Sequence, residues 1–405
     1  ATATRAIHFD IQKPAIFSAS TTAASLGQYV VINGGGFAGD GAQVATLLEL
    51  AGTFTPDDGS GDLTLDLTLV PEFVSGPQVR YVLSESDPLG TLIDLRKQSG
   101  LINGTVQPIV ADGNTQVAGE AVPVQLQILR IKQVVFVNFL PSYVESLRKF
   151  GLRAADPQIR ARVLEVAARD YAGVNMDFRA TTPDDFAQFS TVDLAGPDPN
   201  GQGLLGYDNT PGKDTDNLRL YDHIGGVNAV TEEDGSPGYG GVFVEGFFGF
   251  SHHPNGLAAP LGDDNTTFDP IFDPFRPDVG GRELTAGELA ALQPPTLSDG
   301  SLCPARDRTT QIACAIRVLG NMIGTTMTHE VGHSLGLANP YGPGYHDPGD
   351  LPNRLMEVGG ARPFDERAEL NGQGPAMFCD TAYDYLRTIL LSASDAPVVE
   401  RPSCE

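Results

Sequence analysis

The chain has 405 residues, of which 41% are hydrophobic, and its formal net charge is -25 at pH 7. This length predicts two or three domains, and the apolar fraction is sufficient for a sizeable core. The acidic balance excludes a protein that binds the nucleic-acid backbone, which requires a basic face, and no apolar run is long enough for a transmembrane segment. Residues 1–4 lack the pattern of a signal peptide and are expected to be a mature N-terminus.

Residues 1–131 are predicted to form an all-β region. Short alternating or β-branched runs are separated by clusters of Gly, Pro, Asp and Ser. They cover residues 29–33, 63–70, 79–83 and 122–129. This rhythm of short strands and turns is typical of a β-sandwich.

The first of these runs also carries a family resemblance. Residues 14–17, Pro-Ala-Ile-Phe, are followed by the glycine-rich stretch 27–37. Together they resemble the opening of the immunoglobulin-like TIG (IPT) domains. The resemblance implies an immunoglobulin-like sandwich over residues 1–131, with association to a cell surface or matrix as its expected role.

From about residue 132 the pattern changes to alternating strands and helices. A helix is predicted to start at Asp156, as the N-cap, with Pro157 at its first position. Residues 239–250 are strand-like, and are expected to be either an edge strand that pairs with a peptide or a core strand. Further strands are predicted at 133–139, at 174–178 and at 186–194. A closing helix is predicted at 376–392, with its inward face formed by Tyr383, Leu386, Ile389 and Leu390.

Acidic loops in this region are candidates for structural Ca²⁺. Residues 197–217 have no EF-hand spacing, so a solvated loop is the favoured interpretation. The same holds for residues 263–265 and 269–278. Adjacent His252 and His253 would face opposite ways on a strand and are expected at the surface. The possible calcium ligands in the first loop are Asp198, Asn200, Asp208, Asp214 and Asp216.

The strongest functional motif is His-Glu-x-x-His at residues 329–333. Apolar residues recur before and within it at spacings of three or four, which predicts a helix. On that helix His329 and His333 are one turn apart, so both imidazoles can bind one Zn²⁺. Glu330 then lies beside the water that the metal activates, and can take its proton. Gly336 is expected to end the helix, since Gly accepts a left-handed cap.

This motif, extended to Gly336, resembles the active-site signature of the metzincin zinc peptidases, and Met356 resembles their Met-turn. The resemblance implies an α+β zinc peptidase domain over residues 132–405. It also implies Glu330 as the general base and a sheet that binds substrate as an added strand.

The chain departs from the metzincin pattern at the third metal ligand. Asn339 stands where the family usually has its third histidine, and an amide oxygen is a weak zinc ligand. His346 offers an imidazole and is preferred over Asn339, with Asp347 as a further alternative. Asp347 or Asp350 can instead orient a ligating imidazole. Tyr341 and Tyr345 are candidates to stabilise an oxyanion, or are packing residues.

The four cysteines, all in the last quarter of the chain, allow three pairings. Pairing of neighbours, Cys303–Cys314 and Cys379–Cys404, is the simplest, and four buried thiols are the alternative. Disulfides imply an oxidising compartment and hence export. The sequence therefore predicts a secreted, bacterial-type zinc endopeptidase that acts on proteins or peptides. The alternative is a non-catalytic or weakly active extracellular surface or matrix protein that retains the fold; Asn339 favours it and the retained Glu330 opposes it.

Overall fold

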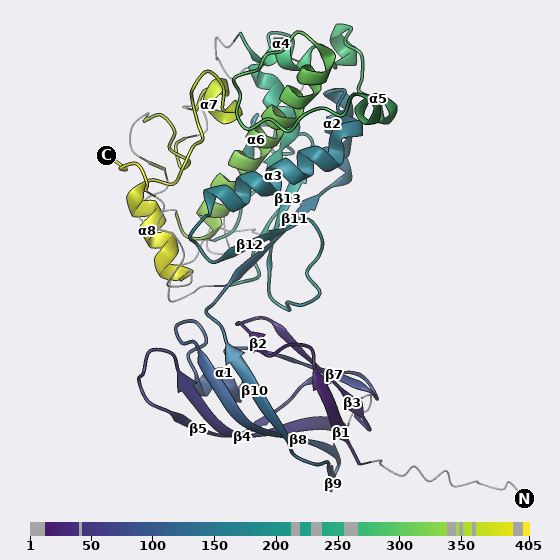
Figure 1. Ribbon diagram of the computed structural model, residues 1–405, viewed down its shortest axis with the longest axis vertical. Helices are drawn as coiled ribbons and strands as arrows, with labels where there is room; N and C mark the ends of the chain where they lie inside the picture. The colour runs from purple at the N-terminus through teal and green to yellow at the C-terminus, as the bar shows by residue number, and fades with distance from the viewer. Residues whose placement is uncertain are drawn as a thin grey trace, which may run out of the picture. The chain divides into compact units, whose positions relative to one another are not determined.

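The computed structural model describes residues 13–39, 43–211, 219–227, 237–254, 266–337, 346–347, 351–358, 362–391 and 400–405. The chain divides into two compact units. The first unit comprises residues 1–132 and 183–188, and the second unit comprises residues 133–182 and 189–405. The protein is thus a multi-sheet α+β chain, with β-structure dominating the first unit and helices joining the sheet in the second (Figure 1).

Two sheets build the first unit. One has the order β1-β3-β7-β6, from Ala15–Ala19, Tyr29–Gly35, Gln78–Val82 and Glu72–Ser75. The other has the order β2-β10-β8-β4-β5, with β9 paired to β8, from Ala23–Ala24, Val122–Ile128, Gly100–Asp112, Val44–Pro56, Leu63–Leu69 and Thr115–Ala118. Except for the parallel pair β2–β10, all neighbours are antiparallel, and a short helix α1 (Pro88–Leu92) follows β7.

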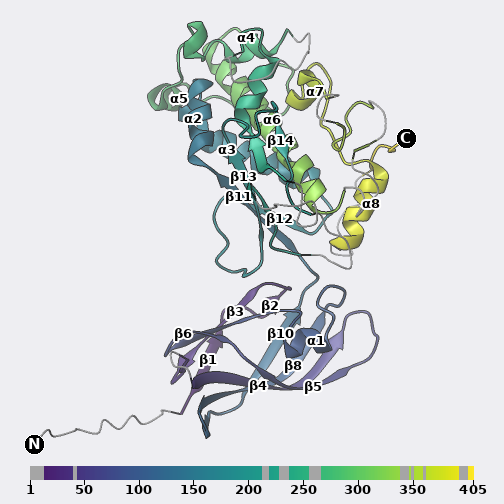
Figure 2. The ribbon, with the colours of Figure 1, turned by 180° about the vertical axis from the view of Figure 1, so that it is seen from behind.

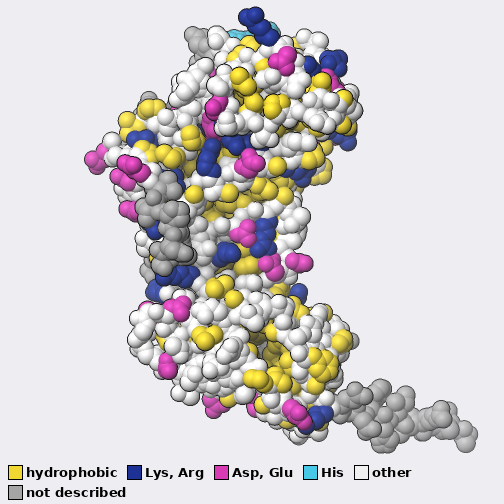
Figure 3. Space-filling model, in the orientation of Figure 1, with side chains coloured by type: hydrophobic (Ala, Val, Ile, Leu, Met, Phe, Trp, Pro, Cys, Tyr) yellow, Lys and Arg dark blue, Asp and Glu magenta, His cyan; other side chains and the backbone are white. Residues whose placement is uncertain are grey.

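The alternation seen in the sequence places one face of each strand in the core. On β3, Val30 and Ile32 are buried while their neighbours are partly exposed. Side chains from both sheets line a common apolar cavity of about 350 Å³, with Ile32 on one sheet and Leu50 on the other. Phe17 at its margin is 76% exposed. Figure 3 shows hydrophobic side chains gathered on the face of the first unit that is turned toward the viewer.

One segment of the later chain belongs to the first unit. The backbone N–H of Tyr29 donates to Asp185 O at 2.8 Å, and that of Ala187 donates to Gly27 O at 2.8 Å. Phe186 is buried there. The prediction of a strand starting at residue 186 is therefore wrong at its beginning, because residues 183–188 pair with the first unit and the strand begins only at Ser190.

The second unit is built on one mixed sheet. Its order is β12-β11-β13-β17-β14, from Met176–Arg179, Gln133–Phe139, Ser190–Ala195, Tyr239–Phe243 and Gly206–Tyr207. The first four strands run parallel, and β14 is antiparallel to β17. Two short strands join the side of the sheet, β15 (His223–Ile224) on β13 and β16 (Gly226–Val227) on β17.

The stretch 239–250 is not a single edge strand. It forms β17 up to Phe243 and then a 3-10 helix, η2, over Val244–Phe250. Because β17 lies between β13 and β14, the edge-strand prediction is wrong and its core-strand alternative is confirmed. The strand at the end of the order is β14, which lies against helix α6 (Figure 2).

Helices occupy the rest of the second unit. The longer ones are α2 (Pro141–Lys149), α3 (Asp156–Asp170), α6 (Arg308–Ser334) and α8 (Asp380–Ile389). The shorter ones are η1 (Arg153–Ala155), α4 (Phe268–Phe272), η3 (Pro277–Val279), α5 (Ala286–Leu292) and α7 (Phe364–Ala368). Helix α3 packs along α6, where a Cβ added to Gly324 would lie 2.7 Å from Val166. No helix among the described residues is long and apolar enough to cross a membrane.

Two predicted helix starts need correction. Asp156 is the first residue of α3 and Ala155 is its N-cap, because the Asp156 carboxylate binds Arg160 Nε at 2.6 Å instead of the helix backbone. Helix α8 begins at Asp380 rather than 376, because the backbone of Met377 pairs with that of Arg354. The inward residues predicted for α8 are all buried: Tyr383, Leu386, Ile389 and Leu390.

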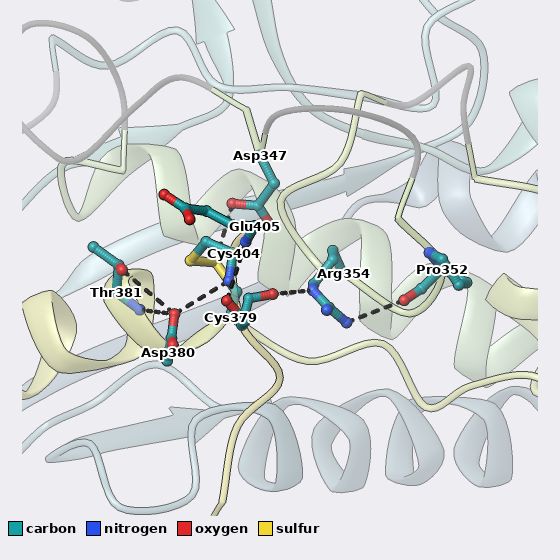
Figure 4. The surroundings of a disulfide bond; sticks show 9 residues. Asp347, Pro352, Arg354, Cys379, Asp380, Thr381, Cys404 and Glu405 are labelled. Carbon is teal, nitrogen blue, oxygen red and sulfur yellow. Dashed lines mark hydrogen bonds between the residues drawn. A yellow bond between two sulfur atoms is a disulfide. The ribbon is translucent and has the colours of Figure 1, made fainter.

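Two disulfides are present, in the pairs expected from the sequence: Cys303–Cys314 and Cys379–Cys404. The first joins the segment before α6 to the first turns of that helix. The second joins the N-cap of α8 to the C-terminal residues, where the backbone N–H of Cys404 also donates to Asp380 (Figure 4). Among the described residues no cysteine is a free thiol, so the alternative of four buried thiols is wrong.

Candidate metal centre

Helix α6 presents the His-Glu-x-x-His motif in its last turns. The Asp307 side chain caps the helix start by accepting from Thr310 N at 3.0 Å. The helix ends where the sequence predicts, because Gly336 adopts φ +96° and Leu337 N donates back to Gly332 O at 3.0 Å. This cap has a second effect: it brings Leu337 O within 2.8 Å of His333 Nδ1.

Three histidines converge at this end of α6. One ring nitrogen from each of His329, His333 and His346 lies within 4.8 Å of the other two. His329 Nδ1 donates to Leu355 O at 2.7 Å, and His333 Nδ1 donates to Leu337 O. These carbonyls assign the proton of each ring to Nδ1, so that each Nε2 carries a lone pair available to a metal.

The spacing of the two histidine nitrogens on α6 fits a tetrahedral metal ion. His329 Nε2 and His333 Nε2 are 3.1 Å apart. Two Zn–N bonds of roughly 2.05 Å at the tetrahedral angle would separate their nitrogens by about 3.3 Å. With both protons on Nδ1, the two Nε2 lone pairs face each other, an arrangement that a shared cation stabilises.

The electrostatic environment keeps the three rings neutral, as metal ligands must be. Burial, followed by the charge of His333, lowers the pKa of His329 well below its usual value. Burial lowers the pKa of His333 to about 4 and also lowers the pKa of His346.

The turn at Leu355 and Met356 contacts both His329 on α6 and the segment that carries His346. Leu355 O orients His329, and Met356 O accepts from the backbone N–H of Asp347, next to His346. The Met356 side chain is buried under α6, where a Cβ added to Gly332 would lie 2.8 Å from its sulfur. This turn therefore packs Met356 against α6 and links it to the segment that carries His346.

Glu330 lies beside the histidines and is 6% exposed. Burial raises its pKa well above the usual range, and the negative charge of Asp208 raises it further. The backbone N–H of Asp208 donates to the Glu330 carboxylate. Strand β14 passes directly over that carboxylate, because a Cβ added to Gly206 would lie 2.4 Å from Glu330 Oε1.

A cavity of about 360 Å³ opens next to these groups. One wall is the segment from Gly203 to Tyr207, and α6 forms another wall with Thr326, Glu330 and the two histidines. The lining is completed by His346, Val358, Arg362 and Arg367. Gly206 and the two arginines were missed by the sequence analysis, since no local motif marks them.

The remaining candidates divide into two groups. Asn339, Tyr341, Tyr345 and Asp350 lie outside the described residues. Asp347 is described, and its Oδ1 lies 3.3 Å from Cys379 Sγ (Figure 4). It is therefore placed against the disulfide rather than with the three histidine nitrogens.

Among the described residues, the calcium candidates Asp198 and Asp208 of the first loop do not share a site. The Asp198 carboxylate accepts from the backbone of three loop residues, and Asp208 accepts from Thr210. Neither belongs to a group of three or more His, Cys, Asp or Glu side chains close enough to share an ion, among the residues described. Asp214, Asp216 and residues 263–265 lie outside the described residues.

A second His–Asp cluster does occur on the surface. His252 and His253 are exposed, as predicted, and their Nδ1 atoms lie 3.0 and 3.1 Å from Asp269 and Asp273, respectively. The buried Arg276 also pairs with Asp273, at 3.1 Å. The cluster is thus an ion-pair network in which Arg276 already supplies a positive charge to the carboxylates.

Comparison with known proteins leaves the chain without an assigned family: no protein-family model matches it, and no curated protein is significantly similar in sequence.

Proposed function

We propose that this protein is a zinc-dependent endopeptidase with a metzincin-like second unit. The observation that carries the proposal is the convergence of His329, His333 and His346, with Glu330 on the same helix turn. An arrangement of three imidazoles leaves a fourth tetrahedral position for a reactant, as in catalytic zinc sites. His346 is the third ligand in this proposal.

The chemistry follows from the placement of Glu330. A bound zinc ion would supply a Lewis acid and lower the pKa of water in the cavity. Glu330 lies in that cavity and can accept the proton of the attacking water, then deliver it to the leaving amine. Its burial and the nearby Asp208 raise its pKa, which favours holding that proton between the two steps.

The position of β14 at the edge of the sheet supports the proposal that the substrate is a peptide. It is the last strand in the order of the sheet, and among the described strands it pairs only with β17. Gly206 and Tyr207 of β14 also line the cavity beside Glu330. An extended peptide that pairs with this edge would therefore pass across the histidine cluster.

We further propose an extracellular setting, with the first unit as an immunoglobulin-like, TIG-like domain that serves attachment to a cell surface or matrix. Its two sheets with a shared apolar interior support this assignment. The two disulfides fit an oxidising compartment.

The test combines metal content with peptide cleavage. The purified protein should bind about one Zn²⁺ at this site and cleave quenched peptides in a chelator-sensitive way. Glu330→Ala should retain the metal and the fold but lose at least about a hundredfold in rate. Parent-like activity in Glu330→Ala would sink the mechanism. A protein that binds zinc but cleaves no peptide would support the non-catalytic alternative.

A further inference from the structure

The carbonyl group that orients His329 is itself held by the C-terminal part of the chain. Leu355 O accepts from His329 Nδ1 at 2.7 Å. The backbone N–H of Leu355 donates to Met377 O at 2.8 Å, and the backbone N–H of Met377 donates to Asn353 O at 3.1 Å. Two backbone hydrogen bonds therefore join the turn beside the histidines to the segment that leads into α8.

The side chain of Arg354, in the same turn, contacts the C-terminal residues. Its Nε donates to Ser403 O at 2.7 Å (Figure 4). These C-terminal residues are also bound to the start of α8, because the backbone N–H of Asp380 donates to Pro402 O at 2.8 Å and the backbone N–H of Cys404 donates to Asp380 Oδ1 at 3.2 Å. Arg354 thus connects the turn to a segment that is fastened to α8.

The Cys379–Cys404 disulfide joins the two segments that hold this turn. Cys379 lies two residues after Met377, and Cys404 directly follows Ser403. The sulfur of Cys379 also lies 3.3 Å from Asp347 Oδ1, in the segment that carries the third histidine. The disulfide is therefore connected both to the group that orients the first histidine of the motif and to the segment of the third one.

The two disulfides differ in position and in access to solvent. Cys303 and Cys314 are 9% and 1% exposed, and His329 follows Cys314 by 15 residues, or about 22 Å along α6. Cys404 is partly exposed and lines a cavity of about 380 Å³ that has His346 in its wall. A small reductant can therefore approach the second disulfide from the side of Cys404.

We infer that Arg354 and the Cys379–Cys404 disulfide are positioning groups for the metal centre, so that the redox state of this disulfide sets the affinity for zinc. The inference rests on the proposed zinc site and adds its regulation. When the disulfide is broken, the C-terminal residues are held at the turn by hydrogen bonds alone. Leu355 O then loses a support of its position against His329, and the imidazole is less well ordered for a metal.

The redox step is an ordinary thiol–disulfide exchange with a dithiol. A thiolate of the dithiol attacks Cys404 Sγ, which forms a mixed disulfide and releases Cys379 as a thiolate that takes up a proton. The second sulfur of the dithiol then displaces Cys404 and becomes oxidised with the first. Two electrons and two protons pass to the protein. In the extracellular setting proposed above, the site would thus reach its full zinc affinity only after oxidation.

The test compares zinc affinity in two double variants of the full chain. Cys379→Ser/Cys404→Ser should bind zinc at least about tenfold more weakly than the parent in a chelator competition, the scale for losing a group that orients a ligand. Cys303→Ser/Cys314→Ser should bind like the parent. Thermal unfolding of the metal-free proteins should fall similarly in both, because the closed loops span 25 and 11 residues and loop entropy varies only with their logarithm. Equal zinc affinity of the two double variants would overturn the inference.

Arg354 provides a test that leaves both disulfides intact. Arg354→Gln should weaken zinc binding by about tenfold, and Arg354→Lys, which can still donate to Ser403 O, should restore most of the affinity. The visible absorption of Co²⁺ bound in place of zinc reports ligand geometry and should change in Arg354→Gln. Arg306→Gln, at an exposed arginine of the same unit, is the control for both measurements. A parent-like affinity and spectrum in Arg354→Gln would contradict its positioning role.

Reduction of the parent protein tests the redox response directly. During treatment with a dithiol, alkylation of samples followed by peptide mapping should label Cys379 and Cys404 before Cys303 and Cys314. Protein reduced at the first pair and freed of dithiol should show the weaker zinc affinity of Cys379→Ser/Cys404→Ser, and reoxidation should restore the parent value. Unchanged affinity after reduction of this pair would refute the redox control.

Zinc affinity is measured without cleavage, so the inference and the proposed function fail separately. A parent that binds zinc and depends on the second disulfide for its affinity, but cleaves no peptide, would refute the peptidase and keep the inference. Cleavage by a zinc-loaded parent, with parent-like affinity in both double variants, would refute the inference and keep the peptidase. A parent that binds no zinc would overturn both.

Discussion

Replacing Gly206 by alanine should disable the proposed catalytic site without changing any of the proposed metal ligands. The added Cβ would lie 2.4 Å from Glu330 Oε1 and 2.8 Å from Glu330 Cγ, so rotation of the carboxylate alone does not relieve the clash. Recovery of an ordinary 3.4 Å contact requires a retreat of about 1 Å by Glu330 or by β14. Misplacement of a catalytic group by that much costs on the order of a hundredfold in rate.

The assay for Gly206→Ala is kcat/KM on a quenched peptide, with zinc content and thermal unfolding measured on the same sample. Zinc content should match the parent, since no ligand is changed, and overpacking should cost about 1–3 kcal/mol of stability. Gly287→Ala is the matched control, because no atom lies within 4 Å of its added Cβ. Parent-like kcat/KM in Gly206→Ala would refute the placement of β14 over Glu330 as a catalytic constraint.

Two further predictions concern the histidines. His346→Ala should weaken zinc binding by well over tenfold in a chelator competition, and Asn339→Ala should weaken it less; parent-like affinity of His346→Ala would remove His346 as third ligand. In the metal-free protein, His333 alone should lower the free energy of unfolding by up to about 3 kcal/mol as pH drops from about 6.5 to about 4, because the unfolded chain binds a proton that folded His333 does not. Denaturant titrations should show a smaller fall for His333→Gln, and an identical fall would contradict this assignment.

Elements with a strong local pattern were predictable from the sequence. The strand at residues 133–139 is found with those bounds as β11, because its β-branched and aromatic run is continuous. The end of α6 follows from one residue, Gly336, whose left-handed φ is permitted by its missing side chain. Similarly, the neighbour pairing of the cysteines needed only short loops, with separations of 11 and 25 residues.

Elements that depend on a distant partner were not predictable. Strand β14 has two residues in a Gly- and Leu-rich loop, and it becomes a strand only through pairing of Gly206 and Tyr207 with β17. In the same way, residues 183–188 carry no local sign that they pair with the first unit. The presence of Arg362 and Arg367 in the cavity beside Glu330 could not be predicted either, because they lie 32 and 37 residues after Glu330 and follow no motif.

For the proposed third metal ligand, ligand chemistry and sequence spacing favour different residues. Asn339 has the spacing of the metzincin signature, whereas His346 has the better ligand atom for zinc. In the structure, the ring of His346 lies 5.4 Å from that of His329 and 5.1 Å from that of His333, centroid to centroid. The backbone bond between Asp347 and Met356 fixes the chain next to His346, which a count along the sequence could not reveal.

Hydrogen bonds that Thr328 of α6 makes with Tyr171 and Asp170 explain how the adjacent His329 is held in place. Tyr171 donates its hydroxyl to Thr328 O at 3.0 Å, and Thr328 Oγ1 donates to the buried carboxylate of Asp170 at 2.8 Å. Burial of Asp170 is costly and raises its pKa, so the net stabilisation from this network is small. Its effect is on geometry, because Thr328 directly precedes His329, whose ring is held from the other side by Leu355 O. With backbone and ring both fixed, His329 needs little further ordering to bind a metal, which is the condition for a precise catalytic site.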